Sequence, residues 1–191
     1  MSGIAERIVR GGYRVVFRSV FANMDPERAH HLAFAVIAGL PRVPFLSGVV
    51  ERYCRPAAAD GITTMGIHFP SRFGLAAGFD KDARGIAGLG LLGFGHVEVG
   101  TITAKPQPGN ERPRLFRLIG DRALINRMGF NNHGAAAAAR RLERARRNPG
   151  RPVIGVNIGK SRVVSVEDAI DDYLESTRRL ATFADYLAVN V

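Results

Sequence analysis

Four short apolar runs divide the chain after residue 73, and longer stretches with helical spacing lie between them. The runs read FGLAAG, HVEVGTIT, PVIGVNI and YLAVNV, and the helical stretches cover residues 82–92, 134–147 and 166–184. Continuous apolar runs of this length are typical of strands buried in a parallel sheet. Because parallel strands need helical connections, this alternation predicts an α/β fold.

The order of these elements fits either a small open sheet or part of a β/α barrel. A complete eightfold barrel usually needs about 250 residues, and only four main strands are visible in 191 residues. The chain ends on a strand of the buried type, so we interpret residues 45–191 as about the first half of a truncated barrel. Residues 105–126, rich in proline and arginine, predict an inserted loop with a small hairpin.

Residues 3–40 predict two amphipathic helices that precede the barrel. On the first helix, spacings of three and four residues place four arginines on one face: Arg7, Arg10, Arg14 and Arg18. The opposite face carries Val9, Tyr13, Val16 and Val20. The second helix begins at Asp25-Pro26, a capping residue followed by proline at the first helical position. We expect Pro41 and Pro44 to end it, and residues 41–60 to form an irregular linker.

The formal net charge of +10 suggests an anionic partner. A basic amphipathic helical pair is typical of an element on an anionic membrane surface, but the same pattern fits a hairpin packed on its own domain. The arginines of residues 140–151 predict a solvated outer helix face. Since no aromatic residues alternate with them, nucleic-acid binding is not expected. No run approaches 18 apolar residues, so a transmembrane helix is not expected either.

Polar side chains recur where the predicted strands end, which is where ligands collect in β/α folds. They are Lys81, Thr101, Asn157 and Asn190. A lysine can pair with a carboxylate, and carboxamides offer a donor and an acceptor to a planar heterocycle. Asn126 and Asn131 add two more amides. A single asparagine is more often a turn or cap residue. The prediction of a ligand site therefore depends on the convergence of all these polar residues at one rim of the sheet. No metal-binding, nucleophile-elbow or phosphate-loop motif is present, and no metal is expected.

Several motifs in the right order resemble the N-terminal half of a dihydroorotate dehydrogenase of the quinone-dependent, membrane-associated class. They are MDPERAHHLAF, GLAAGFDKD, GFGHVEVGTITAKPQPGNERPRLFRL, INRMGFNNHG, GVNIGKS and DYLAVNV, which together cover nearly all of residues 24–191. The resemblance implies a (β/α)8 TIM barrel with FMN that oxidises dihydroorotate to orotate in pyrimidine (UMP) biosynthesis. It also implies a membrane quinone as electron acceptor and a peripheral location on the cytoplasmic side of the cell membrane.

Carried over by position, the resemblance implies three sets of site residues. The residues expected around FMN are Ala77, Gly78, Phe79, Asp80, Lys81, Thr101, Asn157 and Asn190. Those expected around dihydroorotate or orotate are Lys81, Asn126, Arg127, Met128, Gly129, Phe130 and Asn190. His30 and Arg117 are expected beside the quinone, and residues 1–44 are expected to form the lid that admits it from an anionic membrane surface.

The family's catalytic base is a serine just beyond the asparagine that matches Asn190, and this sequence stops at Val191. We therefore expect the 191-residue chain alone to be inactive and to bind FMN poorly. The alternative is a non-catalytic half-barrel that binds a membrane or nucleic acid through its basic surface.

Overall fold

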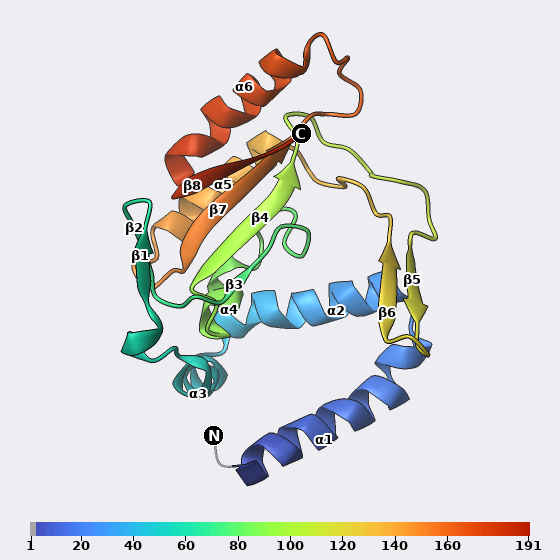
Figure 1. The fold of residues 1–191 in the computed structure, drawn as a ribbon, viewed down its shortest axis with the longest axis vertical. Coiled ribbons are helices and arrows are strands. Elements are labelled where there is room, and N and C mark those ends of the chain that lie inside the picture. Colours follow the sequence, from blue (N-terminus) through green and yellow to red (C-terminus); the bar gives the residue numbers. More distant parts are fainter. Residues whose placement is uncertain (1–2) are drawn as a thin grey trace.

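A four-stranded parallel sheet forms the centre of the molecule (Figure 1). The computed structural model describes residues 3–191 and, within the first helix, the side chains of Arg7 and of residues 10–19. The strands lie side by side in chain order: β3 (Gly74–Leu75), β4 (His96–Ile102), β7 (Val153–Gly159) and β8 (Tyr186–Asn190). The predicted α/β class and its four main strands are confirmed, although β3 is much shorter than the apolar run FGLAAG.

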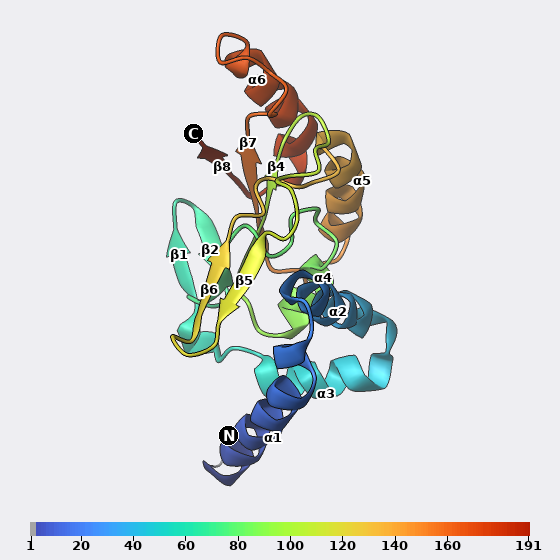
Figure 2. The same ribbon diagram turned by 90° about the vertical axis from the view of Figure 1, so that its right-hand side faces the viewer.

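One face of this sheet is apolar and packs against the connecting helices. These helices are α4 (Ile86–Leu91), α5 (Ala135–Arg146) and α6 (Ala169–Leu180), and α5 and α6 lie on one side of the sheet in Figure 2. From the helices, Leu89, Leu142 and Leu180 enter this core. Alternate residues of β4 and β7 pack against them: Val97, Val99, Ile154, Val156 and Ile158. The two-residue period of a strand explains why every second side chain joins this core.

The opposite face of the sheet carries a polar network. Glu98 of β4 accepts hydrogen bonds from Asn157 Nδ2 of β7 at 2.9 Å and from the hydroxyl of Tyr186 of β8 at 3.1 Å. A Cβ atom at Gly155 would overlap the Tyr186 ring, so this glycine leaves the space in which the ring lies. Burial raises the pKa of Tyr186, and the negative charge of Glu98 acts in the same direction. The hydroxyl therefore remains a donor to Glu98.

The N-terminal region contains three helices rather than two. They are α1 (Gly3–Ser19), α2 (Pro26–Gly39) and α3 (Pro44–Cys54), with short 3-10 turns between them at Phe21–Asn23 and Leu40–Arg42. The predicted irregular linker over residues 41–60 is wrong, because Pro44 begins α3 instead of breaking a helix. Proline is well tolerated at the first helical position, where its missing N–H is not needed. The side chain of Val9 lies outside the described residues.

Helix α2 packs directly against α4. A Cβ atom at Gly88 would overlap the carbonyl oxygen of Ile37, so the two helices approach as closely as a glycine allows. The predicted helix over residues 82–92 begins later, at Ile86, because Asp80 first closes a turn. Its carboxylate accepts the backbone N–H groups of Arg84 at 2.9 Å and Gly85 at 2.7 Å.

Two antiparallel hairpins flank the sheet. The hairpin predicted inside residues 105–126 is confirmed as β5 (Leu115–Leu118) and β6 (Ala123–Asn126). A second hairpin, β1 (Ile62–Thr64) and β2 (Ile67–Phe69), was not predicted. Its turn residues Met65 and Gly66 both have positive φ, at 51° and 73°, and a methionine there gives no turn signal.

Among the described residues, no single helix is long and apolar enough to cross a membrane. By length and composition alone, Pro26–Arg42 and Pro44–Cys54 could do so only as a pair, and they are bent by 105° relative to each other.

Candidate functional site

Three of the predicted strand-end residues lie in one hydrogen-bonded group. The hydroxyl of Thr101, at the end of β4, donates to Asn157 Oδ1 of β7 at 2.6 Å and accepts from Asn190 Nδ2 of β8 at 3.3 Å. Since Asn157 also donates to Glu98, its amide is fixed in one orientation. The parallel register places these carboxyl ends side by side, with Gly159 opposite Asn190. The predicted convergence of Thr101, Asn157 and Asn190 is thus present in the structure.

The segment that follows β3 is joined to the same sheet edge through its backbone. Gly78 N–H donates to the carbonyl of Gly100 at 2.7 Å, and Gly100 N–H donates to the carbonyl of Asp80 at 2.9 Å. Asp80 is only 1% exposed, and its side chain turns back into its own loop. Burial raises its pKa, and the N–H groups of Arg84 and Gly85 oppose that shift. The Asp80 side chain therefore supports the turn.

Lys81 projects from this segment toward the loop that follows β6. Its Nζ donates to the carbonyl of Gly129 and to Asn131 Oδ1, both at 2.8 Å. Burial lowers the pKa of Lys81, and the nearby Arg114 guanidinium lowers it further. An ammonium has three N–H donors, so two are engaged with protein and one remains for an anionic ligand.

The predicted substrate loop, Asn126–Phe130, presents its residues in different directions. Asn126 Oδ1 accepts the N–H of Met128 at 3.0 Å, which is the turn role expected of an isolated asparagine. The Arg127 side chain lies over the Phe116 ring at 5.3 Å and donates to the carbonyl of Pro113. A Cβ atom at Gly159 would lie 3.5 Å from the Phe130 ring, so the loop reaches the end of β7.

A cavity of about 410 Å³ joins the strand-end region to the N-terminal helices. His30 of α2 and Arg117 of β5, the two predicted quinone residues, both line it. It is also lined by residues from the other two predicted sets: Ala77, Gly78, Phe79, Asn126 and Met128. The His30 ring lies 5.0 Å from the Phe79 ring, edge to face, and Arg117 Nη1 donates to the carbonyl of Met24 at 2.5 Å. Burial lowers the pKa of His30 and favours its neutral form.

The residues around this cavity fit a flat aromatic ring system such as that of FMN. Gly78 has a φ of 106°, and a Cβ atom placed there would meet nothing within 4 Å. Open space beside a glycine backbone lets a planar ring approach the main chain closely. Thr101, Asn157 and Asn190 supply hydroxyl and amide groups at the neighbouring strand ends, and such groups can bind a heterocycle that has both donors and acceptors.

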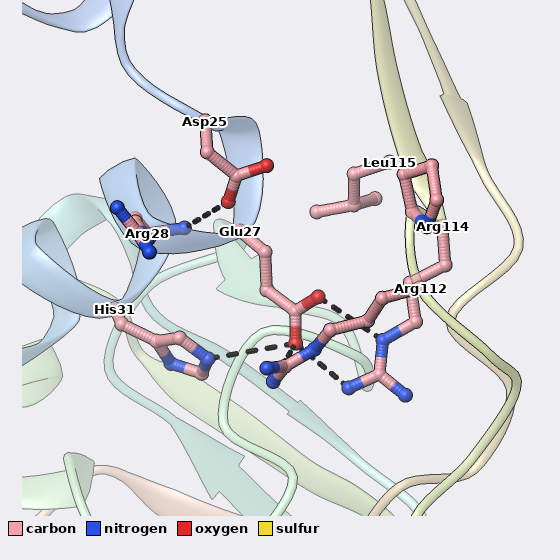
Figure 3. A pocket seen from close by; sticks show the side chains of 8 residues that line it. Asp25, Glu27, Arg28, His31, Arg112, Arg114 and Leu115 are labelled. Atoms are coloured by element: carbon pink, nitrogen blue, oxygen red, sulfur yellow. Dashed lines mark hydrogen bonds and ion pairs between the residues drawn. The ribbon is translucent and has the colours of Figure 1, made fainter.

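A second cavity, also about 410 Å³, contains a cluster of charges that the sequence did not reveal (Figure 3). Figure 3 shows Arg112, Arg114 and His31 converging on the carboxylate of Glu27. Hydrogen bonding from Arg114 holds the pKa of Glu27 at about 2, against the opposing effect of burial. Glu27 follows Pro26 in the first turn of α2, where an acid is expected merely for the helix dipole. The sequence therefore offered no reason to expect that Glu27 pairs with Arg112 and Arg114.

Glu98 and Tyr186 were also missed, although the sequence contained a signal for one of them. In HVEVG, a carboxylate interrupts an apolar run at an alternate position, which is unusual unless that face of the strand is polar. Nothing near Tyr186 in the sequence indicates that its hydroxyl meets this carboxylate.

The fold and the site together define the class of the protein. Parallel strands in chain order, outer helices and a site at the carboxyl ends of the strands are the features of TIM-barrel enzymes. Helices α1 and α2 precede them and contribute residues to the same cavity.

The chain belongs to the dihydroorotate dehydrogenase family, whose model matches residues 61–191. It is 62% identical over 179 residues to a protein of Leifsonia xyli named dihydroorotate dehydrogenase (quinone), with 94% of this chain and 52% of the relative covered. A protein of Clavibacter sepedonicus with the same name is 63% identical, with the same coverage.

Solved structures give the same assignment. The crystal structure of the dehydrogenase from Eimeria tenella in complex with ferulenol matches with a TM-score of 0.74 and 38% identity, over 92% of this chain and 46% of that one. The chain thus spans about half the length of the relatives it matches.

Proposed function

We propose that this chain supplies the first half of the barrel of a longer enzyme, which oxidises dihydroorotate to orotate in de novo pyrimidine biosynthesis. The proposal has FMN as cofactor and a membrane quinone as electron acceptor. One observation carries it: a single cavity is lined both by the glycine-rich segment after β3 and by His30 and Arg117. The names of the relatives support the same reaction. Both are enzyme names, so the alternative of a non-catalytic half-barrel gains no support from them.

Bound FMN would supply an acceptor for the two electrons taken from the substrate. The backbone of residues 77–79 would contact its ring, and Thr101, Asn157 and Asn190 would hold its polar edge. The hydrogen bonds among these three side chains fix their donors and acceptors before a ligand arrives. Such preorganisation reduces the free-energy cost of orienting a cofactor.

Lys81 would bind the carboxylate of dihydroorotate with its remaining N–H donor. The Gly129 carbonyl and Asn131 hold its amine in place, so the charge does not have to be ordered when substrate binds. The loop of residues 126–130 would cover the substrate, with Phe130 excluding water at the end of β7. The proton acceptor for the reaction would come from the part of the enzyme that follows Val191.

The domain division at residues 1–44 and 45–191 remains part of this proposal. The first part would rest on the cytoplasmic face of the membrane and admit quinone toward His30 and Arg117. The exposed apolar side chains of α1 support this use, since Tyr13 is 63% exposed and Val16 47% exposed. In Figure 1, α1 lies apart from the sheet and its covering helices.

The test uses the full-length protein, meaning this chain continued to the length of its relatives. We expect purified protein to carry a yellow flavin and to reduce a soluble quinone analogue when dihydroorotate is added. Replacing Lys81 by alanine should raise the KM for dihydroorotate about 10- to 100-fold, because a charge-assisted hydrogen bond contributes about 1.5–3 kcal/mol. The matched control is Lys105→Ala, at an exposed lysine, which should leave the KM unchanged.

A colourless full-length protein, or one that leaves dihydroorotate unoxidised, would contradict the proposed function. Equal effects of the two lysine variants would contradict the role of Lys81. Residues 1–191 alone should show no dihydroorotate oxidation.

A further inference from the structure

The buried ion pair between Glu27 and Arg114 connects parts of the chain that are 87 residues apart. Arg114 Nη2 donates to Glu27 Oε1 at 2.7 Å, and its Nε donates to Oε2 at 3.1 Å. The two side chains are 5% and 7% exposed. Figure 3 shows the two groups facing each other in a fork-like arrangement between α2 and the strand that begins at Leu115. This bidentate geometry fixes both the distance and the orientation of the two elements.

The same guanidinium also holds the loop that precedes β5. Arg114 Nη1 donates to the carbonyl groups of Pro108 at 2.7 Å and Asn110 at 2.8 Å. Asn110 in turn bonds the substrate loop: its backbone N–H donates to the Met128 carbonyl at 3.0 Å, and its Nδ2 donates to the Arg127 carbonyl at 2.7 Å. A continuous set of hydrogen bonds therefore runs from Glu27 to the backbone of residues 127 and 128.

Each end of this path reaches a residue of the proposed site. Beyond Met128, the carbonyl of Gly129 accepts from Lys81 Nζ at 2.8 Å. At the other end, Glu27 precedes His30 by three residues on α2, so the two lie on the same side of the helix. Fixing Glu27 consequently fixes the rotation of α2 that places the His30 ring against Phe79.

Burying two charges is costly, and a pair of packed apolar side chains often gives equal or greater stability. The pair is therefore better explained by a role in positioning α2 relative to the loop before β5 than by its contribution to stability alone. We propose that the Glu27–Arg114 pair couples helix α2 to the 126–130 loop, so that the quinone side and the dihydroorotate side of the cavity keep one relative position. Glu27 and Arg114 are positioning residues in this proposal. Its kinetic consequence rests on the proposed function, but the coupling itself does not.

The test is hydrogen–deuterium exchange on the full-length protein with Glu27→Gln. This change keeps the side-chain shape and removes the charge that Arg114 pairs with. We expect exchange about tenfold faster both in residues 27–40 and in residues 126–131, although Glu27 has no hydrogen bond to the second segment. The matched control is Glu51→Gln, which removes an exposed pair with Arg55 on α3 and should change neither segment. Glu27→Asp, which keeps the charge on a shorter side chain, should give a smaller effect in both segments.

Faster exchange confined to residues 27–40 would overturn the coupling. If Glu27→Gln does not yield folded protein, the same comparison of exchange in residues 27–40 and 126–131 is made with Glu27→Asp. As a second measurement, Glu27→Gln should raise the KM for dihydroorotate about fivefold or more, with kcat changed less; an unchanged KM in folded protein would also overturn the proposal. If the unmodified protein does not oxidise dihydroorotate, the proposed reaction fails, and the exchange result still decides whether the two segments are coupled.

Discussion

The carboxylate of Glu27 lies beside two arginine guanidinium groups and a histidine ring. Arg114 and Arg112 donate to it, and His31 Nε2 lies 3.7 Å away. The carboxylate of Asp25 instead accepts the backbone N–H of Arg28 and caps α2. The charged form of Glu27 is therefore strongly favoured in the folded protein, and its protonation must weaken the fold.

The stability contributed by Glu27 should depend on pH below 4.5. Its pKa falls from 4.5 to about 2 on folding, which corresponds to about 3 kcal/mol at about 1.4 kcal/mol per pKa unit. For a carboxyl with a lowered pKa, that stability is present above pH 4.5 and is lost as the pH falls toward 2. Urea unfolding should show that the free energy of unfolding of the full-length protein exceeds that of Glu27→Gln, and that this difference becomes smaller as the pH falls from 4.5 toward 2. Glu51→Gln should show no such change, and a difference independent of pH would contradict the assignment.

Residues of the site differ in how well the sequence reveals them. Lys81, Thr101 and Asn157 could be predicted, because each follows or ends an apolar run and the ends of parallel strands meet at one edge. Arg114 could not be predicted, because its role depends on Glu27, which the fold brings to it from the distant helix α2. Arg127 was assigned to the substrate by position, yet its side chain lies over Phe116.

At the scale of elements, the contact between α2 and α4 joins the N-terminal helices to the helices that cover the sheet. Gly88 is the residue that permits it, since any side chain there would meet the backbone of Ile37. The backbone of α2 cannot yield as a flexible side chain could. The strain would therefore separate the two helices or tilt α2.

Replacing Gly88 by alanine should destabilise the protein by about 1–3 kcal/mol, the usual range for inserting a methyl group into a filled contact. A matched control is Gly39→Ala at the end of α2, where a Cβ atom would meet nothing within 4 Å. That change should be neutral or stabilising by less than about 1 kcal/mol, because alanine favours the helix. Chemical denaturation of both variants makes the comparison, and equal effects would show that the close approach is unimportant.

The elements that the sequence failed to predict share a physical reason. Helix α3 begins with Pro44, and a proline signals a helix start as well as a helix end. In the β1–β2 hairpin, each strand has three residues, too few to show an alternating pattern. By contrast, β4 and β7 have seven residues each and were recognised from their apolar runs.

At the scale of the whole molecule, many of the arginines lie in two groups with different surroundings. On α5, Arg140 and Arg144 are exposed on the outer helix face, as predicted, while Ala138 and Leu142 face the core. The other group lies on α1, whose exposed Tyr13 and Val16 add an apolar surface on the face opposite the arginines. Charge alone does not distinguish these surfaces. The exposed apolar side chains do, because they can enter the interfacial layer of a bilayer.

Anionic vesicles should therefore bind the full-length protein through α1 and not through α5. Replacing Arg14 and Arg18 by glutamine removes two charges, each of which contributes about 1 kcal/mol near an anionic surface. The apparent affinity should fall about 30-fold. The control replaces Arg140 and Arg144 in the same way and removes the same charge from the outer helix. Co-sedimentation with phosphatidylglycerol vesicles, compared with neutral phosphatidylcholine vesicles, measures both variants, and added salt should weaken the binding of the unmodified protein. If the two double variants lose affinity equally, net charge governs binding, and α1 is not the membrane-facing element.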